Sequence, residues 1–378
     1  MQKTNRPLTF SIALPVLGQE EFLPTALRSL RAQEAPFRLS VLDATPGLRV
    51  QAVLEEFQDM IAYRRHGADR GQSAAIQEGW DKTDGEILAW LCADDYYFPD
   101  ALQRVREAFA GDVSLDVVWG DSIFVDAQDR FLMYFPGGTD DLRVLACHDC
   151  IPQPSCFIRR RAVERVGGLN QALHYTMDWD LWSRVYETGG KFLYLKRPLS
   201  VTRIHGGMKT LNRSRQRYAE ITAHLKRRVG WIQRVKTLLA FYHYDLDNYR
   251  KGVIDHVLYH VLDVMIRTSQ IVSPRPAFWD EPIYGLERLT NRLRSSCEVL
   301  LPWYQAQPPR RMVIQGDRPI PLVVDVNGSN KQTLNPVAKH GQCEYAFAFT
   351  GPLASAYRIT ISLPQTARDW RLRKLWLE

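Results

Sequence analysis

The sequence lacks any long apolar run: nothing in its 378 residues approaches the roughly 18–20 apolar residues that a helix needs to cross a bilayer. Its first seven residues are polar and lead into a strand pattern, so we expect no signal peptide. Cysteine is scarce, with six scattered residues, which disfavours a disulfide framework and fits a reducing cytoplasm. We detect no internal repeat and no low-complexity tract. These absences predict a globular cytoplasmic protein.

One pair of cysteines, Cys147 and Cys150, has the spacing of a metal-binding or redox motif and encloses His148 and Asp149. A structural zinc site needs a second pair of ligands. The chain has no second Cys or His pair of this kind. We therefore interpret this segment as a loop at the edge of a strand.

Basic residues exceed acidic ones, because 49 Lys and Arg residues face 42 Asp and Glu residues, for a net charge of +7. The surplus is concentrated in residues 203–236. Such a run suits an anionic substrate, an anionic membrane surface or nucleic acid, although we expect most of these side chains to form a solvated helix face. No nucleic-acid motif with interleaved aromatic residues is found, so we expect no nucleic-acid partner.

The first part of the chain alternates between strand and helix patterns with short connections. β-Branched and apolar stretches predict strands, and apolar residues at helical spacing predict helices. The expected strands are residues 9–14, 37–42, 61–64 and 87–92, and the expected helices are residues 20–33, 50–60, 74–80 and 100–110. This alternation predicts an α/β fold with a parallel sheet that is covered on both faces.

The later patterns divide the rest of the chain. Strands are expected at residues 116–119, 122–126, 130–134, 151–158, 192–195 and 199–204, and helices at residues 161–166 and 179–187. Residues 212–299 have helical periodicity. Short strands then follow at residues 312–315, 322–326, 345–349, 357–362 and 371–377, a pattern typical of a small β-sandwich. We therefore expect three domains, at residues 1–211, 212–299 and 300–378.

Two adjacent carboxylates, Asp94 and Asp95, follow the apolar run at residues 87–92. Pro99 then opens the next helix pattern, in the first turn, where its missing N–H costs least. The two acids therefore lie just beyond the carboxyl end of a core strand, at the edge of an open α/β sheet where ligands bind. Adjacent like charges repel, so a divalent cation would stabilise the ionised pair. The alternative is that one of them is a helix N-cap.

Three other residues follow predicted strands, namely Pro15, Asp43 and Asp178. A lone Asp after a strand is usually a helix cap, but Asp43 is followed by Ala-Thr-Pro-Gly rather than by a helix. A carboxylate in such a place can accept a hydrogen bond from an imide or amino N–H of a nucleobase. These residues predict a ligand site along one edge of the sheet.

Eight short segments occur in a fixed order over about residues 9–210. They are Ser-Ile-Ala-Leu-Pro at 11–15, Val-Leu-Asp at 41–43, Asp-Arg-Gly-Gln-Ser at 69–73, Gly-Glu-Ile-Leu-Ala-Trp-Leu at 85–91 with Ala-Asp-Asp at 93–95, Trp-Gly-Asp at 119–121, Ile-Pro-Gln-Pro-Ser at 151–155, Met-Asp-Trp-Asp-Leu-Trp at 177–182, and Arg-Ile-His-Gly-Gly-Met-Lys-Thr at 203–210. Each is weak alone, but in this order and spacing they resemble the family 2 glycosyltransferases. The resemblance implies a GT-A (Rossmann-like) nucleotide-sugar-binding domain.

The resemblance also implies a role for each residue of the donor site. Asp94 and Asp95 look like the family's DXD-type motif: Asp95 would bind Mn²⁺ or Mg²⁺ held by the nucleotide diphosphate, and Asp94 would contact the ribose or the donor sugar. His205 would complete the metal's ligands or touch the diphosphate, the alternative being a packed or hydrogen-bonded imidazole. The remaining donor-site residues would be Pro15 and Asp43 at the base, Arg70, Gly71 and Gln72 near the ribose and phosphates, and Lys209, which would add positive charge.

Asp178 occupies the place of the family's catalytic base, usually part of a Glu-Asp pair whose Glu is here Met177. This base removes the proton of the acceptor hydroxyl as it attacks the anomeric carbon, so the family inverts that centre. Asp180 is the rival candidate, although we expect it to cap a helix. Gln153 and Trp179 are the candidates for contact with the acceptor sugar, the alternative for Trp179 being a position in the core.

The sequence departs from the family pattern on both sides of the predicted base pocket, at Leu17 and Gly18 and at residues 44–47. The identity of the nucleobase therefore stays open. The segment at residues 226–244 is basic and contains aromatic residues, which suggests a peripheral contact with the inner face of a membrane. The terminal strands suit a carbohydrate-binding, docking or packing module, and the oligomeric state is open.

The sequence thus predicts a metal-dependent, inverting glycosyltransferase. It would move a sugar from a nucleotide-diphosphate sugar to a hydroxyl of a glycan or another glycoconjugate, in surface polysaccharide synthesis. A nucleotidyltransferase is the alternative enzyme, but such enzymes usually have a Gly-rich, Lys- or Arg-containing loop after the first strand, which residues 15–21 lack. The alternative without catalysis is a nucleotide- or sugar-binding scaffold with a degenerate site.

Overall fold

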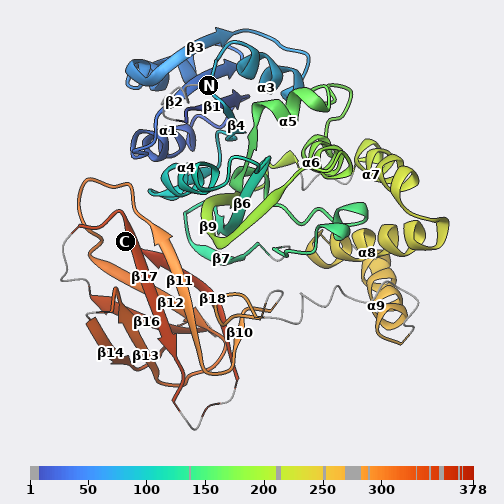
Figure 1. The fold of residues 1–378 in the computed structure, drawn as a ribbon. Helices are drawn as coiled ribbons and strands as arrows, with labels where there is room; N and C mark the ends of the chain where they lie inside the picture. Colours follow the sequence, from blue (N-terminus) through green and yellow to red (C-terminus); the bar gives the residue numbers. More distant parts are fainter. Residues whose placement is uncertain are drawn as a thin grey trace.

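The computed structural model describes residues 8–135, 138–209, 214–249, 253–268, 282–287, 290–328, 330–339, 342–348, 353–364, 367 and 369–378. The polar N-terminus and Asn212, the expected start of the helical segment, lie outside these ranges. In Figure 1 the N-terminal sheet and its helices lie above the C-terminal strands. To one side lie three helices, α7 (Arg215–Arg228), α8 (Trp231–Tyr249) and α9 (Val253–Thr268). Among the described helices, none combines the length and the apolar character that crossing a membrane requires.

Four parallel strands form the first half of the main sheet, in the order β4-β1-β2-β3. These strands and the helices around them are β1 (Phe10–Val16), α1 (Leu23–Arg31), β2 (Phe37–Asp43), α2 (Arg49–Glu55), η1 (Gln58–Met60), β3 (Ile61–His66), α3 (Gln72–Asp81) and β4 (Ile87–Trp90). Alternate side chains of β1 enter two different cores, because Ile12 and Leu14 belong to one apolar cluster and Ala13 to the other. The predicted strand–helix alternation is confirmed here.

The second half of the main sheet is mixed, so the parallel arrangement expected from the strand–helix alternation does not continue beyond β4. Its elements are β5 (Tyr96–Tyr97), α4 (Ala101–Gly111), β6 (Val117–Asp126), β7 (Phe131–Tyr134), η2 (Leu142–Ala146), η3 (Gln153–Ser155), β8 (Cys156–Arg159), α5 (Arg160–Arg165), α6 (Met177–Glu187) and β9 (Phe192–Ile204). Strand β8 is antiparallel to both β4 and β6, whereas β6 is parallel to β9. Strands β6 and β9 are each continuous where the sequence predicts two shorter strands. Strands β6 and β9 pair with each other on both sides of the register shifts near Gly120, so neither strand ends there.

The C-terminal strands that the structure describes start at Arg292, inside the range that was expected to be helical. They are β10 (Arg292–Leu293), β11 (Ser296–Pro302), β12 (Arg311–Gly316), β13 (Leu322–Val326), β14 (Asn330–Leu334), β15 (Val337–Lys339), β16 (Gln342–Ala348), β17 (Ala356–Ser362) and β18 (Trp370–Leu377). The buried residues of β11 alternate with less buried ones, which is the period of a strand and not of a helix. Strands β11-β17-β13-β14 form a separate antiparallel sheet. Strands β15-β16-β12-β18 extend the main sheet, because β18 pairs with β7.

Candidate active site

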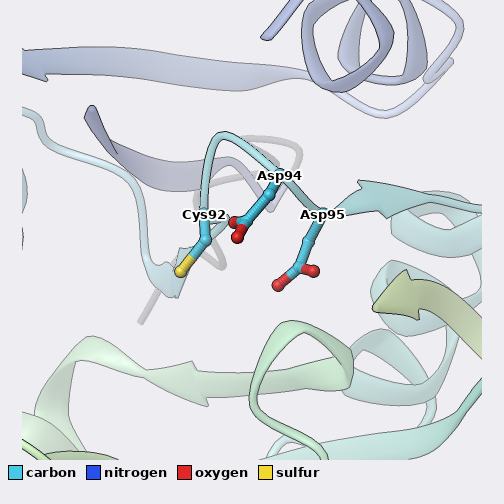
Figure 2. Close-up of side chains that lie close together, drawn as sticks. All are labelled: Cys92, Asp94 and Asp95. Carbon is cyan, nitrogen blue, oxygen red and sulfur yellow. The ribbon is translucent and has the colours of Figure 1, made fainter. Parts of the chain in front are cut away.

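The two adjacent acids lie in the turn that follows β4, at the carboxyl end of the parallel strands. Asp94 is 8% exposed and Asp95 is 6% exposed. Figure 2 shows that their side chains and that of Cys92 project to the same side of the turn, and their ligand atoms all lie within 4.8 Å of one another. The N-cap of the next helix, α4, is Asp100, so neither acid is its cap. We call Cys92, Asp94 and Asp95 the acidic corner.

Strand β9 supplies the partners of the acidic corner, because β5 pairs with β9 directly after the two acids. The backbone N–H of Arg203 donates to Asp95 Oδ1 at 3.1 Å, and its Nε donates to the Asp94 carbonyl at 3.2 Å. The guanidinium is only 2% exposed and pairs with Asp129 at 2.7 Å. Sequence reasoning missed this role of Arg203, although the residue opens the last recognised segment.

His205 reaches the acidic corner through Asp94. Its Nε2 lies 2.9 Å from Asp94 Oδ2, and its Nδ1 accepts a hydrogen bond from the Gly207 backbone N–H at 3.3 Å. With Nδ1 as acceptor, Nε2 carries the proton and donates to Asp94. His205 is therefore hydrogen-bonded here, and its role as a metal ligand stays a prediction.

The electrostatics of the acidic corner favour oxygen ligands. Burial raises the pKa of the Asp95 carboxyl well above its ordinary value, and the charge of Asp94 raises it further. Burial also raises the pKa of the Cys92 thiol, so the sulfur stays protonated at neutral pH. The corner therefore offers carboxylate oxygens, which are the ligands that hard divalent cations such as Mn²⁺ and Mg²⁺ bind.

Asp178 lies in the first turn of α6, which begins two residues earlier than predicted. One of its oxygens accepts a hydrogen bond from the Trp179 backbone N–H at 2.8 Å. Burial raises the pKa of Asp178, against the opposing effects of this hydrogen bond and of the positive charge of Lys209. A raised pKa brings a carboxylate nearer to the range of a general base. Met177 is buried, and its sulfur accepts a hydrogen bond from Ser73 Oγ at 2.7 Å, so it holds α6 against α3.

The neighbours of Asp178 have structural partners. Asp180 is buried and pairs with Arg184 Nε at 2.7 Å, and the N-cap of α6 is Thr176, so the expected cap role of Asp180 is wrong. Trp179 is buried and its indole N–H donates to the Leu145 carbonyl at 2.7 Å, which favours the alternative that it is a core residue. Among the described residues no ion-pair partner is found for Asp178, in contrast to Asp180.

A second group of predicted residues meets beside the acidic corner. Gln72, the first residue of α3, donates from Nε2 to Cys92 Sγ at 3.3 Å, and its Oε1 accepts from Lys209 Nζ at 3.0 Å. Gln153 lies on the other side of Cys92, with 3.6 Å between the Cys92 sulfur and its Oε1. Gln72, Lys209 and Gln153 thus converge on the corner.

Arg70 and Gly71 precede this group without joining it. Gly71 is the N-cap residue of α3, with a φ of 108°, and its N–H donates to Asp69 Oδ1 at 2.8 Å. That φ lies in a region that side chains other than glycine rarely adopt, so Gly71 shapes the turn. Arg70 is exposed and lines an open cavity of about 440 Å³ whose lining includes no residue of the acidic corner.

The carboxylate of Asp43, at the predicted base pocket, already has hydrogen-bond partners within the protein. Asp43 is fully buried at the end of β2, and its Oδ1 accepts from the Thr45 backbone N–H at 2.9 Å. Its Oδ2 lies 2.7 Å from His66 Nδ1 and accepts from Gln51 Nε2 at 3.0 Å. Pro15 is half-buried in the neighbouring strand β1. Sequence reasoning missed Gln51, which lies on α2, and His66, whose contact with Asp43 depends on the pairing of β2 with β3.

Comparison with known families decides what this site belongs to. A sequence-family model described as "Glycosyl transferase family 2" matches residues 11–167, a range that contains the acidic corner. Over residues 11–167 this chain matches the family 2 glycosyltransferases. The resemblance seen in the sequence is thereby confirmed, and the chain has the family's GT-A fold with a mixed sheet and an additional C-terminal antiparallel sheet.

Two curated relatives carry similar sequences. The uncharacterized glycosyltransferase alr2836 of Nostoc sp. is 30% identical over 219 residues, which cover 53% of this chain and 66% of that protein. The O-antigen biosynthesis protein RfbC of Myxococcus xanthus is 29% identical over 204 residues, which cover 52% of this chain and 16% of that protein. The chain therefore spans less than two thirds of the length of these relatives.

Two solved structures are also similar to this glycosyltransferase. S. aureus TarS 1-349, solved in complex with UDP-GlcNAc, is 13% identical with a TM-score of 0.47, covering 70% of this chain and 81% of that one. The mannosyltransferase PcManGT from Pyrobaculum calidifontis, solved in complex with GDP-Man and Mn²⁺, is 15% identical with a TM-score of 0.41. That alignment covers 72% of this chain and 78% of the mannosyltransferase.

Proposed function

We propose that this chain is a metal-dependent, inverting glycosyltransferase. It moves a sugar from a nucleotide-diphosphate sugar to a hydroxyl of a glycan or another glycoconjugate. The observation that carries this proposal is the acidic corner, with two buried carboxylates at the ligand-binding edge of a GT-A sheet. Lys209 lies beside it through Gln72 and adds a positive charge for an anionic donor.

The donor site fits a divalent cation, Mn²⁺ or Mg²⁺, with Asp95 as its protein ligand. Such a cation, when bound, stabilises the negative charge that gathers on the departing diphosphate. Support comes from the donor set, since the two carboxylates are buried and close and the nearby Cys92 thiol stays protonated. Asp94 would contact the ribose or donor sugar. His205 would either contact the diphosphate or give up its hydrogen bond to Asp94 and bind the cation.

Asp178 would act as the general base. It would accept the proton of the acceptor hydroxyl while that oxygen attacks the anomeric carbon from the face opposite the leaving diphosphate, so the centre is inverted. Its raised pKa and its freedom from ion pairing support this role over Asp180, which is paired with Arg184. Gln153, beside the acidic corner, is the better placed of the two predicted acceptor contacts because Trp179 is packed in the core.

The nucleotide would lie across the loops that follow β1, β2 and β3. Asp43 would accept from a nucleobase N–H, and we propose that His66 and Gln51 hold its carboxylate in place for this contact. Pro15 would line the same pocket. Gly71 and Gln72 would lie near the ribose and phosphates, as would Arg70 after a change of side-chain rotamer.

Surface polysaccharide synthesis is the process that we propose for this enzyme. The similarity to an O-antigen biosynthesis protein supports it. We also propose that residues 1–211 form the catalytic domain and that the C-terminal strands form a β-sandwich-like domain. Apolar side chains from both C-terminal sheets, such as Ile314 and Ile359, belong to one cluster, which supports the sandwich.

Exposed apolar residues at the junction of α7 and α8 support a location at the cytoplasmic face of a membrane. Trp231, Ile232 and Val235 are 68%, 55% and 44% exposed. Five Lys and Arg residues and no acidic residue lie between Glu220 and Asp245, which suits an anionic lipid surface. Phosphatidylglycerol vesicles should therefore sediment the protein at low salt but not a Trp231→Glu variant, and Val113→Glu, another exposed apolar site, is the matched control.

A thermal-shift screen of nucleotide diphosphates and nucleotide sugars, with and without Mn²⁺, tests the proposed donor site. A ligand that binds the folded state stabilises it by about 2.7 kcal/mol at 100 times its Kd. We expect one nucleotide series to raise the melting temperature, and to raise it more with the metal than without it. No shift with any nucleotide would instead favour a scaffold with a degenerate site.

A further inference from the structure

Asp149 is a half-buried residue with one buried carboxylate oxygen, and the reaction described above does not use it. It lies in the loop between η2 and η3, inside the Cys147–Cys150 segment. The backbone N–H of Ile151 donates to its carboxylate, but Oδ1 is buried and has no hydrogen-bond partner among the residues that the structure describes. Buried polar atoms are nearly always paired, so such an atom marks a place where something else completes the pairing.

The loop that carries Asp149 is fixed at both ends to the two parts of the active site. At one end the Leu145 carbonyl accepts from the Trp179 indole N–H at 2.7 Å, next to the proposed base on α6. At the other end Gln153 Nε2 donates to the Trp90 carbonyl at 2.9 Å, just before the acidic corner. In the sequence, Asp149 lies between these two fixed points.

The negative charge of Asp178 affects the pKa of Asp149. Burial raises the pKa of the Asp149 carboxyl well above its ordinary value, and the charge of Asp178 raises it further. Both carboxylates also raise the pKa of Cys156, at the start of β8, after the larger effect of burial. The other titratable group that faces Asp149 is Cys150. None of these neighbours is a cation, so no described ion pair explains why a carboxylate is kept here.

We propose that Asp149 is a substrate contact, whose unpartnered Oδ1 forms a hydrogen bond with a hydroxyl of the acceptor sugar. That hydroxyl would lie next to the one whose proton goes to Asp178. Sugar hydroxyls both donate and accept, so this contact forms with either protonation state of the carboxyl. The inference rests on the proposed function, because it requires an acceptor sugar at Asp178.

The protonation of Asp149 gives a test that needs no substrate. A carboxyl whose folded-state pKa is raised lowers the stability of the fold once the pH exceeds its unfolded value of about 3.9. Asp149→Asn removes this cost, so its melting temperature should exceed that of the unmodified protein at pH 8, by about 2 °C or more, and the gain should shrink at pH 5. A carboxylate that merely holds the loop together would give a loss of stability in both buffers.

Transfer assays supply the second readout. With Mn²⁺, a UDP- or GDP-sugar and a panel of p-nitrophenyl glycosides as acceptors, Asp149→Ala should lower kcat/KM for the acceptor by about 10–100-fold, the loss of a hydrogen bond to a polar or charged group. The KM for the donor should stay within about twofold. The matched control is Asp116→Asn, a buried carboxylate whose ion pairs with Arg165 and Arg161 lower its pKa against burial. This control should lose stability at pH 8 and keep its kcat/KM.

Three results separate the outcomes. Unchanged acceptor kinetics in Asp149→Ala, or a destabilised Asp149→Asn, overturn the role of Asp149 and leave the proposed function standing. An unmodified protein that transfers no sugar to any glycoside and binds no nucleotide overturns the proposed function, and this inference falls with it. Weakened acceptor use together with the gain in stability at pH 8 supports the contact.

Discussion

The two carboxylate sites of this glycosyltransferase are built in opposite ways. At the acidic corner, the end of strand β9 and the residue after it hold both acids, since His205 contacts Asp94 and the backbone of Arg203 contacts Asp95. At the start of α6, Asp178 has a backbone N–H as its partner, and in the loop between η2 and η3 one oxygen of Asp149 has no partner among the described residues. The first site is preorganised before any ligand arrives, as suits a cation and a diphosphate. The carboxylates of the second site have fewer protein partners and keep hydrogen-bonding capacity for a ligand.

The largest expected effect comes from changing Asp178, at the start of α6. Asp178→Asn should lower the rate of transfer by about 10²–10⁴-fold, the range for loss of a general base, because an amide cannot accept the proton. Binding of a nucleotide in the presence of Mn²⁺, measured by calorimetry, should stay nearly unchanged. Full activity of this variant would rule out Asp178 as the base. Asp180→Asn, two residues further along α6, is the matched variant.

A smaller effect is expected at the acidic corner. Asp95→Ala should weaken metal-dependent nucleotide binding by about 10–100-fold, by analogy with the loss of groups that hold a metal site. Binding measured in EDTA should change little, since the nucleobase and ribose contacts remain. If the Kd changes equally with and without Mn²⁺, Asp95 acts on the nucleotide and not on a cation.

The smallest expected effect is the pH dependence of kcat, which reports the protonation of the proposed base, Asp178. The base must be ionised, and burial raises its pKa, so kcat should rise with pH through a value above the ordinary 3.9 or so of an aspartate. Below that value the rate should fall by about tenfold for each pH unit. Rate profiles at saturating metal and donor measure this limb, which the residual activity of Asp178→Asn should not show. A profile that is flat from pH 4 to pH 8 contradicts the assignment.

Local sequence patterns predicted the first half of the fold well. Strand–helix alternation is a short-range signal, and β1 to β4 follow it closely. The mixed half depends on pairing between distant segments, which no local pattern records. Gly120 and residues 196–198 interrupt the apolar pattern and made two continuous strands, β6 and β9, look like four.

The candidate site shows the same limit. Asp94, Asp95, Gln72 and Lys209 were predicted from order and spacing, and the fold brings them together. The contacts of Arg203 and Asp149 depend on which strand or loop lies opposite, which a linear sequence does not give. The side-chain directions of Trp179 and Asp180 were equally hidden, because neighbouring positions on one helix face different surroundings.

Strand β18 has a consequence for how the chain can be divided. It pairs with β7 of the catalytic sheet at Leu375 and Phe131, and Lys374 Nζ lies 2.7 Å from Asp126 Oδ2, 248 positions earlier. Proteolysis or truncation before β18 would therefore uncover the edge of β7, and an uncovered edge is a template for pairing between copies. The N-terminal half without β18 should aggregate, even though every residue of its candidate active site is retained.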